Sequence, residues 1–188
     1  MKIRITPGAL LLLGVMLFTG NILFCATLLA AAVHECGHLL AARALGIRLR
    51  LLELDIPGAR ILPAGPLPSY AAEGWLAAAG PISSFLLAAF ILHFRGEFST
   101  ALLAATLSQG LFNLLPIAGF DGGRIFTAVT SFLKEPIAAK TRSVASYLSV
   151  FFLFSLSATL LLRYGENLSL AVLSASLFTR IFLFEEAP

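Results

Sequence analysis

Long apolar blocks, separated by short segments that carry charges, glycine or proline, occupy most of this chain. A transmembrane helix needs about 20 consecutive apolar residues, and several of the blocks reach that length. A turn at Thr19-Gly20-Asn21 separates the first block from the second. We therefore expect an all-α polytopic membrane protein with about six transmembrane helices. The expected spans cover about residues 8–20, 22–45, 71–94, 98–117, 143–163 and 167–184.

Residues 47–70 follow a different pattern. Ile47–Leu51 alternates apolar with basic residues, and Leu52–Ile56 alternates apolar with acidic ones. A period of two predicts strands, and Pro57-Gly58 predicts a turn between them. We expect a short β-hairpin between spans two and three, at the cytoplasmic interface or packed against the helices, because an unpaired strand is costly in lipid. It is either an amphipathic connector or an edge that pairs with an unwound substrate segment.

The composition agrees with the apolar pattern. The 188 residues are 59% hydrophobic and 12% charged, whereas a soluble domain carries about 25% charged residues. We expect one integral-membrane domain over residues 1–188, surrounded by the lipid bilayer, without a soluble appendage. The net charge of +3 is small and spread among the predicted loops, so we expect no nucleic-acid partner.

The basic residues divide unevenly between the two sides of the membrane. If the six spans alternate in direction, eleven of the 13 Lys and Arg residues fall on one side, and only Arg95 and Arg163 fall on the other. Cytoplasmic loops carry such an excess of basic residues. We therefore expect both termini in the cytoplasm and His38 toward the cytoplasmic end of span two.

One stretch inside span two, His34-Glu35-Cys36-Gly37-His38, combines two imidazoles with a carboxylate. Helical residues four apart lie on one face, about 40° apart around the axis. Ionisable groups at membrane depth are costly and mark functional sites. This HExxH spacing supplies two His ligands for zinc and a Glu that takes a proton from the water held by the metal. We predict His34 and His38 as metal ligands and Glu35 as a catalytic residue.

A catalytic zinc site has three protein ligands and one open position, so a third ligand is needed. Most other carboxylates fall in predicted loops or at span ends, whereas Asp121 adjoins an apolar span that is broken by Pro116, Gly119, Gly122 and Gly123. Broken backbone at membrane depth is tolerated where it lines a polar cavity. We predict Asp121 as the third ligand and the break as the route for water. The alternative is that Asp121 caps the helix that follows it.

Asn113 lies near the middle of span four in this assignment. A buried amide needs hydrogen-bond partners. Two roles therefore stay open for Asn113. It either steadies the packing of spans, or it hydrogen-bonds a substrate backbone or a tetrahedral intermediate.

Taken together, the motifs resemble the site-2 protease family of intramembrane zinc metalloproteases, most closely the branch that includes the stage IV sporulation protein FB, which cleaves a pro-sigma factor. The resemblance covers about residues 8–133, with 143–184 as accessory spans. It implies a membrane-embedded protein substrate, Zn²⁺ as cofactor, and regulation by an inhibitory membrane-protein partner. The implied roles are zinc binding by His34, His38 and Asp121, acid/base catalysis by Glu35, and assistance by Asn113. The motifs that carry the resemblance are His34–His38, Gly80-Pro81 and Asn113-x-x-Pro116-x4-Asp121-Gly122-Gly123.

The chain also departs from this family. Gly80-Pro81 is usually followed by an Asn, whereas this chain has Ser83-Ser84, which weakens any polar role for that element. A nucleotide-sensing CBS domain and an inserted PDZ domain are both missing from the sequence, so ATP sensing and the envelope-stress branch are not expected. The expected location is the cytoplasmic membrane of a bacterium.

The main alternative is a membrane metal transporter or a metal-binding sensor that uses the same His and Asp residues. A transporter needs further polar residues along a path through the membrane. The candidates for such a path, Asn21, His93 and Gln109, are isolated in the sequence. The pattern therefore favours proteolysis over transport.

Overall fold

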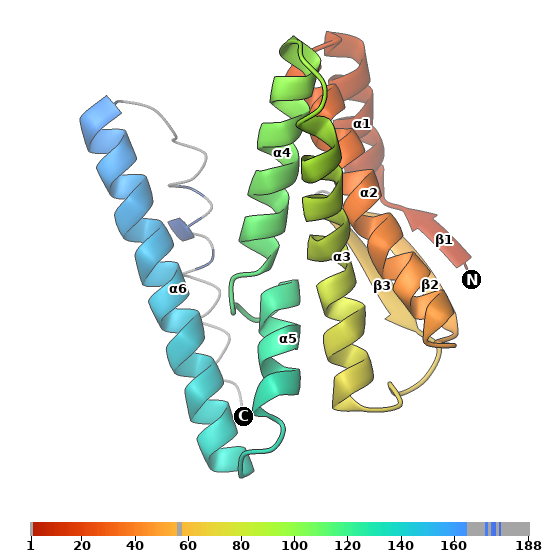
Figure 1. Ribbon diagram of the computed structural model, residues 1–188, viewed down its shortest axis with the longest axis vertical. Coiled ribbons are helices and arrows are strands. Elements are labelled where there is room, and N and C mark those ends of the chain that lie inside the picture. The colour runs from red at the N-terminus through yellow and green to blue at the C-terminus, as the bar shows by residue number, and fades with distance from the viewer. Residues whose placement is uncertain (1, 56–57, 165–171, 173, 176, 178–188) are drawn as a thin grey trace. The chain divides into compact units, whose positions relative to one another are not determined.

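The structure is a computed structural model that describes residues 2–55, 58–164, 172, 174–175 and 177 (Figure 1). The chain divides into two compact units, Met1–Leu114 and Leu115–Pro188. The described residues form six helices and one three-stranded sheet. The expectation of a single domain over residues 1–188 stays a prediction.

Four of the helices belong to the first unit, and their bounds follow the expected spans closely. They are α1 (Pro7–Thr19), α2 (Ile22–Ala44), α3 (Tyr70–Ile91) and α4 (Glu97–Asn113). Glycine with a positive φ of 58° ends α1 at Gly20, and the Asn21 side chain then accepts a hydrogen bond from the Leu23 amide at 2.8 Å. Both are ordinary helix-end devices. The predicted turn between the first two helices is therefore confirmed.

Helices α2, α3 and α4 pack against one another (Figure 1). The face of α2 that is buried carries one residue every four positions, so it forms a narrow stripe along the helix. Most members of this stripe are alanines, which allow the helices to approach closely, as is common between membrane helices. The two histidines of the HExxH stretch belong to the same stripe. Its members are Ala26, Ala30, His34, His38 and Ala42.

The sheet of the first unit contains the predicted hairpin and one further strand. The hairpin strands β2 (Leu49–Asp55) and β3 (Gly58–Pro63) pair antiparallel, and β1 (Lys2–Ile5) pairs parallel with the outer edge of β2. A third strand was not predicted, although Lys2–Ile5 alternates basic and apolar residues with the same period of two. Arg4 lies opposite Glu53 in the register, and their charged groups are 3.4 Å apart. The all-α description is therefore corrected to six helices with a small sheet.

The second unit contains α5 (Asp121–Thr130) and α6 (Glu135–Tyr164), which pack against each other. The sequence predicted a span only from residue 143, but α6 begins eight residues earlier. A polar first turn that includes Glu135 obscured this start, because the apolar pattern begins only later. The expected span over 167–184 lies mostly outside the described residues, of which 172, 174, 175 and 177 are helical.

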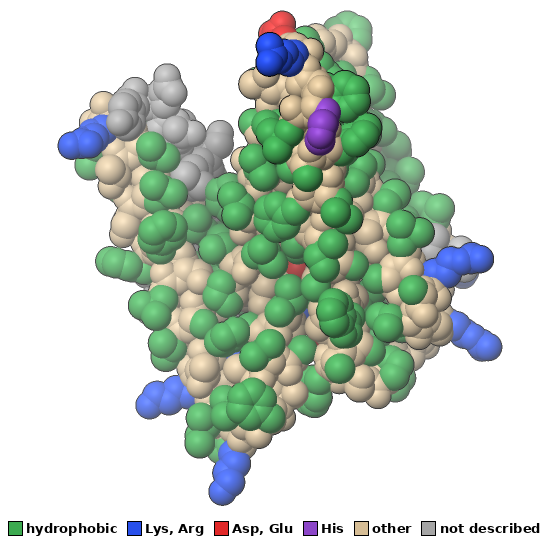
Figure 2. All heavy atoms as spheres, in the orientation of Figure 1, with side chains coloured by type: hydrophobic (Ala, Val, Ile, Leu, Met, Phe, Trp, Pro, Cys, Tyr) green, Lys and Arg blue, Asp and Glu red, His purple; other side chains and the backbone are tan. Residues whose placement is uncertain are grey.

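Three helical segments are long and apolar enough to cross a membrane: Ile22–Ala44, Tyr70–Ile91 and Glu135–Arg163. The apolar α1 is shorter than a full span, and α4 has 17 residues. Apolar side chains are spread over the face shown in Figure 2, and Phe18 and Leu162 are 95% and 87% exposed. Such surfaces are costly in water. These features agree with an integral membrane protein, while the expected number of six spans is not confirmed.

Candidate metal centre

The two histidines of the HExxH stretch lie together inside the first unit. His34 and His38 are one turn apart on α2, and their side chains are 2% and 6% exposed. Their Nε2 atoms are 3.3 Å apart, and the two rings meet nearly at right angles. The imidazoles therefore converge with the same nitrogen, which is the arrangement that two ligands of one ion require.

Helix α3 holds the other nitrogen of each ring. His38 Nδ1 hydrogen-bonds the Leu76 carbonyl oxygen at 2.8 Å, and His34 Nδ1 hydrogen-bonds Ser84 Oγ at 2.9 Å. A carbonyl can only accept, so Nδ1 of His38 must carry the proton, and in the neutral ring Nε2 is then the nitrogen that can bind a metal ion. Outer partners of this kind orient the His ligands of metal sites and fix their tautomer.

Two glycines allow α2 and α3 to approach this closely. A Cβ atom at Gly37 would lie 2.5 Å from both the Ala79 carbonyl oxygen and Ser83 Oγ. A Cβ atom at Gly80 would lie 2.6 Å from His34 Nε2 and closer still to His38 Nε2. The absence of a side chain at Gly80 therefore lets both imidazole rings pack directly against the backbone of α3. The convergence of their two Nε2 atoms fits two ligands of one metal ion.

The serines after Pro81 have polar contacts that the sequence did not indicate. Ser83 Oγ donates toward the carbonyl oxygens of Gly80 at 2.7 Å and Val33 at 3.0 Å, so it links α3 to the backbone of α2. Ser84 contacts His34 as described above. The prediction that serine in place of Asn weakens the polar role of this element is therefore wrong.

Glu35 follows His34 on α2 and is half-buried. On a helix its side chain points about 100° away from that of His34. Cys36, the next residue, is exposed and free of a disulfide. Glu35 is therefore more buried than its neighbour Cys36.

Asp121 belongs to the second unit, where it is the first residue of α5 and is 8% exposed. The residue at the N-cap position is Phe120, and the cap has no side-chain hydrogen bond. The alternative that Asp121 caps the helix is therefore wrong. A carboxylate in the first turn is still favoured by the helix dipole.

The predicted break before Asp121 is confirmed. Residues 114–120 are not helical, and Gly119 has a φ of 93°, which favours glycine. A Cβ atom at Gly123 would collide with the Ile117 carbonyl group, so glycine lets the first turn of α5 lie directly on the backbone of the break. Ser146 of α6 donates to the Pro116 carbonyl oxygen at 2.9 Å and holds the other end of the segment.

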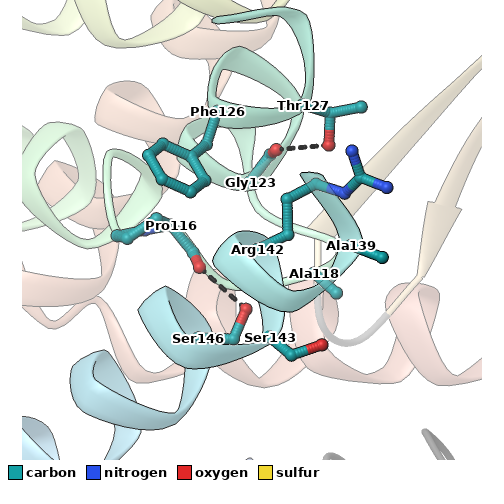
Figure 3. A pocket seen from close by; sticks show the side chains of 9 residues that line it. All are labelled: Pro116, Ala118, Gly123, Phe126, Thr127, Ala139, Arg142, Ser143 and Ser146. Carbon is teal, nitrogen blue, oxygen red and sulfur yellow. Dashed lines mark hydrogen bonds between the residues drawn. The ribbon is translucent and has the colours of Figure 1, made fainter. Parts of the chain in front are cut away.

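A pocket of about 240 Å³ lies along this break within the second unit (Figure 3). One basic side chain, Arg142, lines it and also forms an ion pair with Glu135 at 2.7 Å. The hydroxyl groups of Thr127 and Ser146 donate to backbone carbonyls. The wall is otherwise mostly apolar or backbone. Its full lining comprises Pro116, Ala118, Gly123, Phe126, Thr127, Ala139, Arg142, Ser143 and Ser146.

Asn113 is the last residue of α4 rather than a residue near the middle of a span. It is half-buried, and its side-chain amide donates to the Gln109 carbonyl oxygen of its own helix at 3.1 Å. The early end of α4 reflects the break, which begins at Leu114, two residues before Pro116. The contact within its own helix uses one N–H of the Asn113 amide, so the second N–H and the oxygen are available for either of the two predicted roles.

Together, the predicted ligands form a chemically suitable donor set. His34, His38 and Asp121 are all buried, and each offers one ligand atom to a metal ion. Two neutral imidazoles and one carboxylate are ligands that zinc accepts in catalytic sites. The sequence identified these three residues, but it missed Gly80, Ser84 and the Leu76 carbonyl. Their signal was the four-residue spacing 76, 80 and 84, which places them on one face of α3.

Comparisons with known proteins agree with this chemistry. The sequence profile of Peptidase family M50 matches residues 95–156. A zinc metalloprotease of the archaeon Methanocaldococcus jannaschii is 31% identical over 157 residues, which covers 75% of this chain and 45% of the relative. The chain thus spans less than half of that relative. The site-2 protease structure from the same organism has a TM-score of 0.66 at 20% identity and covers 99% of this chain and 91% of that one.

These findings show that the chain is similar to members of the M50, or site-2 protease, family. The structural likeness shows that the fold is shared. The class of the curated relative and the donor set of His34, His38 and Asp121 together confirm zinc as the expected cofactor. The branch within the family and the roles of the individual residues stay predictions.

Proposed function

We propose that this protein is an intramembrane zinc metalloprotease of the site-2 protease type, which hydrolyses a peptide bond within or beside the membrane-embedded segment of another protein. The observation that carries the proposal is the buried His pair, whose Nε2 atoms converge at 3.3 Å beside the backbone of Gly80. The family comparisons support the same activity.

In this proposal, His34 and His38 of the first unit and Asp121 of the second unit hold one zinc ion. Each is buried, and a buried polar group needs a partner to offset its desolvation. Asp121 follows directly after the non-helical segment that contains Gly119. Phe120 occupies the N-cap position of α5, so the Asp121 carboxylate is not the helix cap. Three such ligands leave a fourth position for water or substrate.

The side chains of the chain itself would then carry the proton transfers. Bound zinc supplies a Lewis acid that polarises the scissile carbonyl and lowers the pKa of water toward about 7. Glu35 takes the proton of the attacking water and returns it to the leaving amine. Asn113 assists by donating a hydrogen bond to the substrate backbone or to the developing oxyanion. Water reaches the reaction along the Pro116–Gly123 break.

The substrate in this proposal is itself a membrane-embedded helix. Its carbonyl groups are hydrogen-bonded within the helix, so the segment must unwind before attack. The sheet of the first unit offers outer strand edges on which an unwound segment can pair. Processing of a pro-sigma factor, control by an inhibitory membrane protein, and both termini in the cytoplasm of a bacterium are the finer parts of the proposal.

The test uses purified full-length protein in proteoliposomes with a single-span membrane protein as substrate. Glu35→Gln should retain bound zinc and lose cleavage by at least about a hundredfold, the lower range for one acid/base group. Glu97→Gln, a change at a carboxylate in the first turn of α4, serves as the matched control and should cleave normally. Undiminished cleavage by Glu35→Gln would contradict the mechanism. Zinc flux across the bilayer without cleavage would favour the transporter instead.

A further inference from the structure

Ser84 is fully buried, with 0% exposure, and its hydroxyl oxygen lies 2.9 Å from His34 Nδ1. It occupies α3 four residues after Gly80, so both residues face the His pair from the same side of the helix. The His pair is therefore held by one stripe of α3. The Leu76 carbonyl contacts His38, Gly80 lets both rings pack against the α3 backbone, and Ser84 contacts His34.

The two histidines differ in the nature of their outer partners. The partner of His38 is a backbone carbonyl, which no side-chain substitution removes and which can only accept a hydrogen bond. The partner of His34 is a single hydroxyl group, supplied by one residue. The orientation of the His34 ring can therefore be disturbed by a substitution at Ser84. The hydrogen bond of His38 goes to a backbone carbonyl, which a side-chain substitution does not remove.

Packing on the far side holds Ser84 in place. A Cβ atom at Gly110 of α4 would lie 3.3 Å from the Ser84 Cβ atom, so Gly110 allows α4 to press closely on this part of α3. Ser84 lies between α2 and α4, and its hydroxyl group faces the imidazole. A buried hydroxyl without a partner costs about 1–3 kcal/mol, which favours the position in which it bonds His34.

We propose that Ser84 is the positioning residue of His34: it accepts the Nδ1–H hydrogen bond, fixes the proton on that nitrogen, and directs the Nε2 lone pair toward the metal. The inference rests on the proposed function, because it assigns a role toward the same zinc ion. Ser84 acts through His34 and does not touch the substrate. Loss of an outer partner of a metal-ligating His typically costs about 10–100-fold in metal affinity.

The neighbouring Ser83 provides the matched control. It is also on α3 and partly buried, but its hydroxyl contacts only backbone carbonyl oxygens, those of Gly80, Val33 and, at 3.5 Å, His34, and the structure records no hydrogen bond from it to an imidazole ring. Ser157 of α6 is a second control, because it is 1% exposed and hydrogen-bonds Ser174 Oγ at 3.3 Å. Removing either hydroxyl tests the general cost of losing a buried hydrogen bond.

The experiment measures the zinc dissociation constant of full-length protein by competition with a chelator, and the visible absorption bands of the Co²⁺-substituted protein. Ser84→Ala should raise the dissociation constant about 10–100-fold and shift the Co²⁺ bands, because the His34 ring is no longer oriented. Ser84→Thr keeps the hydroxyl and should restore most of the affinity. The threonine methyl group can disturb packing, so Ser84→Cys is measured as well. A thiol is a weak hydrogen-bonding group, so Ser84→Cys should lose less zinc affinity than Ser84→Ala. Ser83→Ala and Ser157→Ala should leave both readouts close to wild type.

Two results would overturn the inference. One is an unchanged zinc dissociation constant and Co²⁺ spectrum in Ser84→Ala. The other is an equal loss in Ser84→Ala and Ser83→Ala, which would indicate a general packing effect. In either case a wild-type protein that binds one zinc and cleaves its substrate leaves the proposed function standing. A wild-type protein that binds no zinc overturns both.

Discussion

The His pair offers imidazole nitrogens from within a regular helix, whereas Asp121 offers a carboxylate oxygen from the end of a non-helical segment. His34 and His38 lie within an unbroken helix, and α3 fixes both rings through their Nδ1 atoms. Asp121 begins a helix directly after a non-helical segment that contains Gly119 at a φ of 93°. One half of the donor set is thus oriented by a neighbouring helix and the other by its own backbone.

This difference determines which substitutions should disturb the position of each group of ligands. Substitutions on the α3 stripe should disturb the His pair and leave the break unchanged. Substitutions at the glycines of the break should displace Asp121 while the His pair stays ordered. Substitutions at Gly80 and Gly123 test this division, and the change at Gly80 should have the larger effect.

Gly80→Ala should abolish zinc binding while the protein still folds. The new methyl group would collide with both Nε2 atoms, and alanine is by itself a better helix former than glycine. Zinc content of the purified protein and its helical circular dichroism check the two parts of this prediction.

Gly14→Ala is the matched control for that change. Gly14 lies in α1, and a Cβ atom there meets nothing within 4 Å. It should retain full zinc and gain up to about 1 kcal/mol in helix stability. Equal zinc content in Gly80→Ala and Gly14→Ala would mean that the close packing of the His rings on Gly80 is not needed for metal binding.

Gly123→Ala should have a smaller effect, confined to the Asp121 half. Its Cβ atom would meet the Ile117 carbonyl group, so the start of α5 must shift. Overpacking of this kind costs about 1–3 kcal/mol in stability. We expect a lower zinc affinity and a lower melting temperature, each measured on the full-length protein, with the Co²⁺ spectrum still showing coordination by the His pair. A loss of the His contribution to that spectrum would contradict the division between the halves.

Much of this arrangement could be predicted from the sequence because its signals are periodic or local. The four-residue spacing of His34 and His38 on an apolar helix, and the proline and glycines before Asp121, each have a direct physical meaning. The alternation in residues 47–56 likewise predicted strands. Each of these features depends on residues that are close together in the chain.

The features that were missed depend on contacts between distant segments. Pairing of Lys2–Ile5 with β2, the Leu76 carbonyl as partner of His38, and the contact of Ser84 with His34 all join residues from 38 to 50 positions apart. A backbone carbonyl carries no sequence signal, and serine in place of Asn was taken as a loss. Packing of α3 on α2, which Gly37 and Gly80 allow, creates the contacts of Leu76 and Ser84 with the two histidines.

The most direct test of the central claim is the zinc-to-protein ratio of purified full-length chains in which one carboxylate is removed. Wild type and Glu97→Ala should each bind about one zinc, because Glu97 lies in the exposed first turn of α4. Asp121→Ala should lose the metal at the same free zinc concentration, since two histidines alone leave a catalytic zinc site one ligand short. One zinc retained in Asp121→Ala, with unchanged affinity, would contradict the account.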